Sequence, residues 1–176
     1  MVGLREIIQG QHDDEFLTNT DFDRGLAELT RRDIPYDLLI YEDQLRSAIA
    51  FIDRHPNQRF VLDHIAKPII QRSEYSKRWD HGFRELAQRD NVVCKLSGMV
   101  TEVRDPDWSA ELLRPYIETA LDAFGTGRLM FGSDWPVCLL RAEYADWFEA
   151  VSSLNLSANE RDALFSTACT RAYGLD

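Results

Sequence analysis

Five short apolar runs alternate with amphipathic stretches along the 176 residues, and this alternation constrains the fold more than any other feature. The runs lie near residues 2–7, 36–41, 60–65, 91–97 and 128–133. Short runs of this kind are typical of strands that are buried on both faces of a parallel sheet. Because units of about 30 residues match a strand–helix–strand repeat, the spacing predicts right-handed crossovers and an α/β fold.

The segments between and after these runs show helical periodicity. Apolar residues recur at intervals of three and four over 22–29, 45–52, 112–124 and 144–151, and the pattern is strongest over 112–124. A last helix is predicted from the capping box Ser157–Glu160, with Leu164, Phe165 and Ala168 on its buried face.

The predicted sheet has the character of a barrel rather than of a dinucleotide-binding fold. No Gly-x-Gly-x-x-Gly follows the first run, and polar residues of catalytic type follow several strands at their carboxyl ends. A (β/α)8 barrel needs eight units and about 250 residues. We therefore expect residues 1–176 to form a single incomplete barrel domain of roughly the last five strand–helix units, lacking the N-terminal three strands.

Two strand ends carry residues that point to hydrolytic chemistry. Asp134 follows the fifth run within Phe131-Gly132-Ser133-Asp134-Trp135-Pro136, and His64 follows the third run within Phe60–Pro68. A carboxylate at the mouth of a barrel can act as a general base on water or as a metal ligand. A neutral imidazole can bind a divalent metal or donate a hydrogen bond to a reacting carbonyl. Loop capping by Asp134 and a structural role for His64 are the alternatives.

Other polar residues near strand ends are weaker candidates. We place Arg5 at the end of the first strand and Tyr41 at the end of the second, where either could hold an anionic or hydroxylated substrate. A surface salt bridge is the alternative for Arg5. Asp63 is expected to orient its neighbours rather than to react. Lys95 and Ser97 should point the same way because strand residues alternate, and the sequence gives them no role.

Composition excludes several kinds of partner. The net charge of −10 disfavours nucleic acid and anionic membranes, both of which require basic patches. No apolar run is long enough to span a bilayer, and residues 1–6 lack the features of a signal peptide. Three widely spaced cysteines favour free thiols, so we expect a cytoplasmic protein.

Several blocks of the chain resemble those of the amidohydrolase-2 family, and most closely its sugar-lactonase branch. The blocks are Phe60–Pro68, Asn91–Glu102 and Arg128–Leu139, with further matches at 3–5, 13–17 and 168–175. The resemblance implies a barrel hydrolase that opens a small-molecule lactone. It assigns the general base to Asp134, a metal-binding or carbonyl-polarising role to His64, and substrate binding to Arg5. It also implies one divalent metal, with zinc first and His64 and Asp134 as ligands, or no metal at all.

The chain departs from the family pattern in ways that keep alternatives open. The His-x-His pair of the family's first strand is absent, and Glu6 stands where relatives commonly have histidine. An open arc of strands also exposes two edges, which favours pairing with another chain, so a homo-oligomer is one expectation. A metal-dependent decarboxylase of the same superfamily and a non-catalytic remnant that acts only with another chain are the alternative functions.

Overall fold

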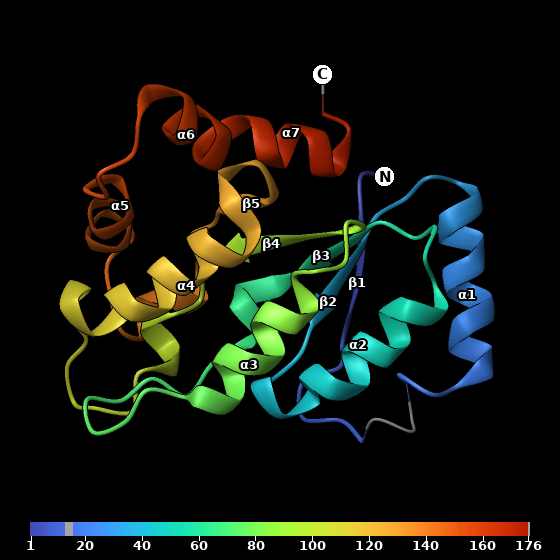
Figure 1. Ribbon diagram of the computed structural model, residues 1–176, viewed down its shortest axis with the longest axis horizontal. Helices are drawn as coiled ribbons and strands as arrows, with labels where there is room; N and C mark the ends of the chain where they lie inside the picture. Colours follow the sequence, from blue (N-terminus) through green and yellow to red (C-terminus); the bar gives the residue numbers. More distant parts are fainter. Residues whose placement is uncertain (13–15, 176) are drawn as a thin grey trace.

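The computed structural model describes residues 1–12 and 16–175, and its centre is a parallel sheet. The strands are β1 (Leu4–Ile7), β2 (Tyr36–Leu39), β3 (Phe60–Leu62), β4 (Val92–Leu96) and β5 (Leu129–Phe131). They pair in sequence order, with every neighbouring pair parallel (Figure 1). The predicted α/β fold with a parallel sheet is therefore confirmed, although each strand is shorter than its apolar run.

Four helices pack against one face of the sheet. They are α1 (Thr20–Arg31), α2 (Leu45–Arg54), α3 (Lys77–Leu86) and α4 (Ala110–Arg128). Alternate strand residues such as Tyr36, Phe60 and Leu62 meet the apolar faces of these helices in one continuous core. Side-chain caps define where helices begin: Ser76 Oγ accepts from Trp79 N at 3.3 Å at the start of α3. The periodicity of the sequence did not single out α3, because its apolar residues are separated by charged ones.

Short helical turns follow the strands or precede the helices. They are η1 (Glu42–Gln44), η2 (Asp63–Ala66), η3 (Val100–Glu102) and η4 (Val137–Leu140). The chain then continues through α5 (Tyr144–Ser152), α6 (Ala158–Asp162), the π-helical turn η5 (Ala163–Thr167) and α7 (Ala168–Tyr173). The predicted capping box is confirmed, since Ser157 and Glu160 bond reciprocally at the start of α6. No helix within the described residues is both long and apolar enough to cross a membrane.

The C-terminal helix α7 lies at the end of the sheet where the strands begin (Figure 1). Its residues Ala168 and Ala172 form a second apolar cluster with Val61 and Met130, which project from the sheet face opposite the four helices. The Tyr173 ring reaches the backbone of Gly3, just before β1. Helix α7 thus covers the lower part of the face that a closed barrel would turn inward, and it leaves the carboxyl ends of the strands free.

The outer strands of the described sheet each have one neighbour. Strand β1 pairs with β2 alone, and all four of its residues are exposed, with Leu4 at 40% and Ile7 at 53%. An exposed apolar edge strand is a template for pairing with further strands. The open edge accords with the expectation of an incomplete barrel.

Candidate active site

The carboxyl ends of three neighbouring strands bring together His64, Ser97 and Asp134. His64 Nδ1 lies 2.8 Å from Ser97 Oγ, and His64 Nε2 lies 3.4 Å from Asp134 Oδ1. His64 and Ser97 are buried, and the Asp134 side chain is 14% exposed. The sequence predicted that the histidine and the aspartate lie at the same edge of the sheet, and their contact confirms that placement.

An unusual backbone turn aims His64 at its neighbours. Residues 64–67 all have positive φ, with His64 at 52° and Ile65 at 47°. This left-handed region is costly for residues with a Cβ, and most of all for a β-branched one. The surrounding structure holds the turn in place, because Trp79 Nε1 donates to Ile65 O at 2.6 Å from within the core. The loop between β3 and α3 therefore fixes the imidazole rigidly.

Two glycines give the histidine and the serine their space. Gly98 has φ of 64°, and a Cβ there would lie 2.8 Å from His64 Cβ and Cγ. A Cβ on Gly132 would lie 3.1 Å from Ser97 Cβ. A side chain at Gly98 would displace the imidazole, and one at Gly132 would crowd the serine. The glycines are thus part of the geometry that joins the three strand ends.

The loop that carries Asp134 is anchored at several points. Asp134 has φ of 56°, and its carbonyl accepts from Cys138 N at 2.9 Å. Just before it, Gly132 O accepts from Trp147 Nε1 at 2.8 Å, which ties the end of β5 to α5. The carboxylate is therefore held by a packed scaffold rather than by a free loop.

Burial sets the protonation state of the histidine. Removal of His64 from water lowers its pKa below the ordinary value, against the attraction of Asp63 and Asp134, which raise it. At neutral pH the imidazole is therefore uncharged. A neutral imidazole has one N–H donor and one nitrogen lone pair, so it can assist a reaction through either function.

A chain of buried charges runs along the sheet beneath this site. Asp63 is fully buried and pairs with Lys95 Nζ at 2.7 Å and with Arg5 Nη1 at 2.9 Å. Lys95 also pairs with Asp37 at 2.5 Å, and the Tyr173 hydroxyl donates to Asp37 at 2.7 Å. Burial alone would raise the pKa of Asp63, but Lys95, His64 and Arg5 outweigh it, so this pKa lies below its ordinary value.

The remaining predicted residues lie at some distance from the His64–Asp134 contact. Arg5 is the second residue of β1, so the prediction that it ends the strand is wrong, and its guanidinium lies on Asp63. Tyr41 lies two residues beyond β2, with Lys67 Nζ 5.7 Å from its ring centre. Within the described residues, no hydrogen bond or ion pair joins the Tyr41 side chain to His64 or Asp134. Substrate binding by Arg5 and Tyr41 stays a prediction.

Sequence reasoning missed the partners of the predicted residues. Alternation correctly placed Lys95 and Ser97 on one face, but it could not reveal that they contact Asp63 and His64. The strand pairing that aligns β3 with β4 creates both contacts. Nothing in the sequence pointed to Asp37 and Tyr173, which are 136 residues apart along the chain.

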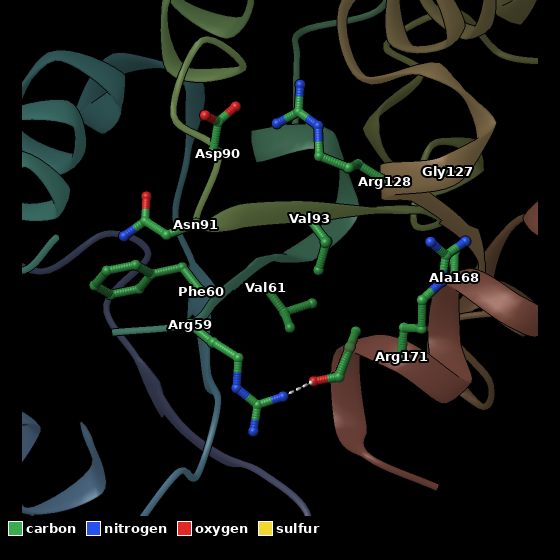
Figure 2. Close-up of a pocket in the computed structure, with 11 residues that line it drawn as sticks. Arg59, Phe60, Val61, Asp90, Asn91, Val93, Gly127, Arg128, Ala168 and Arg171 are labelled. Atoms are coloured by element: carbon green, nitrogen blue, oxygen red, sulfur yellow. Dashed lines mark hydrogen bonds between the residues drawn. The ribbon is translucent and has the colours of Figure 1, made fainter. Parts of the chain in front are cut away.

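A cavity of about 230 Å³ lies at the opposite end of the sheet, between β3, β4 and α7. Figure 2 shows Arg59, Arg128 and Arg171 around it. Arg59 Nη1 donates to Ala172 O at 3.0 Å, and Arg128 Nη2 donates to Ala87 O at 2.8 Å. Because two of its three cations are bound to backbone carbonyls, we interpret this cavity as a packing feature and not as the site of chemistry.

The described residues do not by themselves form a metal centre. They include no group of three or more His, Cys, Asp or Glu side chains that could hold an ion. Catalytic zinc normally has three protein ligands, and His64 with Asp134 supplies two.

The whole described fold has known counterparts. A family model described as amidohydrolase matches residues 2–175. The chain belongs to this family. An L-fucono-1,5-lactonase from Burkholderia multivorans is 43% identical over 98% of the chain. The chain spans 62% of that relative's length, so it corresponds to less than two thirds of the relative.

Solved structures of the family agree closely with this one. An amidohydrolase from Burkholderia multivorans with bound HEPES is 42% identical, with a TM-score of 0.93 over all of this chain and 66% of its own. Another crystal form with bound zinc has 43% identity and a TM-score of 0.91, over 99% and 64% of the two chains. The predicted family and the partial (β/α)8 barrel are confirmed. The resembling block at 13–17 lies partly outside the described residues.

Proposed function

We propose that this chain carries part of the active site of a hydrolase that opens a sugar lactone, with Asp134 as general base and His64 assisting. The contact between His64 Nε2 and Asp134 Oδ1 at the carboxyl end of the sheet is the observation that carries the proposal. Barrel enzymes place their catalytic residues at this end of the sheet. The name of the L-fucono-1,5-lactonase relative supports a sugar lactone as the substrate class.

The reaction needs a base and a hydrogen-bond donor near one water molecule. Asp134 takes a proton from water as the water oxygen attacks the lactone carbonyl carbon. The ring C–O bond then breaks, and the departing ring oxygen receives the proton, which leaves an open hydroxy acid. His64, which is neutral and fixed by its turn, orients the carboxylate or donates to the developing oxyanion.

Arg5 and Tyr41 complete the proposal as substrate-binding residues. The Arg5 side chain is 46% exposed and uses one nitrogen for Asp63, and its other nitrogens have no ion-pair partner among the residues that the structure describes, so they can meet a hydroxyl or carboxylate. Should a divalent metal take part, His64 and Asp134 are the ligands that this chain offers. With two such ligands we expect weak binding, measurable by zinc titration calorimetry.

The test is turnover of L-fucono-1,5-lactone, followed by acid release in a weakly buffered solution with a pH indicator. We expect Asp134→Asn to reduce the rate by about a hundredfold or more, because loss of a general base has effects of that order. Asp146→Asn, at an exposed position of α5, is the matched control and should keep full activity. Retained turnover in the Asp134 variant contradicts the assignment, and release of carbon dioxide from a carboxylic acid substrate, with the lactone left unopened, indicates the decarboxylase alternative.

The same assay also tests whether the chain is active by itself. If the folded 176-residue chain shows no turnover, the non-catalytic alternative gains support, and association with another chain becomes the question. Sedimentation velocity of the same sample then decides whether the exposed edge of β1 joins copies of the chain.

A further inference from the structure

Both ring nitrogens of His64 have a neighbour, and together these neighbours define which nitrogen carries the hydrogen. Nε2 faces Asp134 Oδ1 at 3.4 Å, and Nδ1 faces Ser97 Oγ at 2.8 Å. A neutral imidazole has one N–H, whereas an ionised carboxylate can only accept. A lone pair on Nε2 would therefore face the negative carboxylate, so the favourable arrangement has the hydrogen on Nε2.

The hydroxyl of Ser97 completes this arrangement. With its hydrogen on Nε2, the imidazole offers a lone pair at Nδ1, which needs a donor because the site is buried. Ser97 is 1% exposed, and within the described part of the chain its hydroxyl has His64 as its hydrogen-bond partner. A serine hydroxyl rotates to donate, and 2.8 Å is an ordinary O–H···N distance.

Two glycines leave the space that the serine hydroxyl and the imidazole occupy. The would-be Cβ of Gly132 lies 3.3 Å from Ser97 Oγ, and that of Gly98 lies 2.9 Å from His64 Nδ1. Because neither glycine has a Cβ, the hydroxyl and the ring have the room to lie against each other at 2.8 Å.

We propose that Ser97 is a positioning residue: its hydroxyl donates to His64 Nδ1 and fixes the tautomer whose Nε2–H faces Asp134 and the attacking water. The catalytic consequence rests on the proposed lactone hydrolysis. The tautomer itself is a property of the folded chain and can be measured without turnover.

Two isosteric variants test the role of the hydroxyl. Ser97→Thr keeps the hydroxyl and Ser97→Val replaces it by a methyl group, with the same added volume near Gly132. Ser97→Ala adds no volume and serves where the branched side chains prevent folding. The four histidines of ¹⁵N-labelled protein are observed in long-range ¹H–¹⁵N spectra after chelator treatment, and His64→Gln identifies the signals of residue 64.

We expect the Nε2–H tautomer for His64 in the wild type and in Ser97→Thr, and a loss of that single tautomer in Ser97→Val and Ser97→Ala. In the lactone assay, the variants without the hydroxyl should lose about tenfold or more in kcat with little change in KM, which is the lower end of the loss seen when the hydrogen-bond partner of a metal-binding histidine is removed. Ser97→Thr should restore most of the loss.

A wild-type spectrum with the hydrogen on Nδ1, or an unchanged Nε2–H tautomer in Ser97→Ala, overturns the proposal. An equal loss of kcat in Ser97→Thr and Ser97→Val, with the tautomer unchanged in both, also overturns it, because packing alone then explains the effect. Absence of lactone opening in the wild type contradicts the proposed function and leaves the spectrum to decide on Ser97.

Discussion

Replacement of Lys95 by methionine should strongly destabilise the fold, because this lysine neutralises two carboxylates on the sheet. Its Nζ lies 2.7 Å from Asp63, which is fully buried, and 2.5 Å from Asp37, which is 12% exposed. In the variant, Arg5 is the cationic partner that remains for Asp63 among the described residues, and Asp37 keeps the Tyr173 hydroxyl. Removal of one partner from a buried ion pair costs about 3–5 kcal/mol.

The assay is urea unfolding at pH 7, followed by circular dichroism. With a slope of about 2 kcal/mol per molar urea, the expected loss lowers the midpoint by about 2 M. Lys77→Met is the matched control, since Lys77 is exposed at the start of α3, and it should change the free energy of unfolding by less than about 0.5 kcal/mol.

The loss of unfolding free energy in Lys95→Met should become smaller as the pH falls. The pKa of Asp63 is lowered in the folded wild type, so its charge contributes stability above the unfolded pKa of about 3.9, and this contribution disappears as pH falls through the folded value. Without Lys95 the burial of Asp63 raises that pKa, and a protonated Asp63 needs no cation. The difference between wild type and variant should therefore narrow toward pH 4. This reasoning is refuted if Lys95→Met lowers the free energy of unfolding by less than about 1 kcal/mol at pH 7. It is also refuted if the difference in that free energy between wild type and variant is as large at pH 4 as at pH 7.

Three further predictions follow from contacts described above. Gly98→Ala should lower the free energy of unfolding by about 1–3 kcal/mol, because Gly98 has a positive φ and an added Cβ would lie too close to His64. Gly25→Ala in α1 is the control and should be neutral or stabilising, since a Cβ there meets no neighbour and alanine favours a helix. Thermal unfolding of the two variants gives the comparison. Tyr173→Phe should cost about 1.5 kcal/mol in the same assay, since Asp37 loses a hydroxyl donor, and an unchanged melting temperature contradicts this. Ile7→Lys should weaken any concentration-dependent self-association measured by sedimentation velocity, while Leu140→Lys, at an exposed position of η4, should not.

The sequence predicted the parts of the fold that depend on local periodicity. The apolar runs at 36–41 and 60–65 became β2 and β3, and the stripe over 112–124 became α4, because burial of one face is a local pattern. It missed α3, in which Trp79, Phe83 and Leu86 are buried among charged neighbours. Strands β2 to β5 also end before their apolar runs do.

The site could be predicted only to the level of strand ends. The locations of His64 and Asp134 followed from their place after apolar runs, but the left-handed turn over 64–67 has no local signature, because Ile65 is a residue that disfavours it. Tertiary contacts such as Trp79 Nε1 to Ile65 O stabilise that turn. They arise from packing between segments that the sequence does not pair.

Side chains along β4 alternate between the two faces of the sheet, so one face carries both a residue that stabilises the fold and a residue that contacts His64. Lys95 and Ser97 are two residues apart on one face, so the lysine lies at the level of Asp63 and the serine at the level of His64. Lys95 compensates the carboxylate of Asp63. Burial lowers the pKa of His64 against the attraction of Asp63 and Asp134, and the positive charges of Lys67 and Lys95 add to that lowering. A substitution at Lys95 therefore removes the compensation of the Asp63 carboxylate and one of the two cations that oppose protonation of His64.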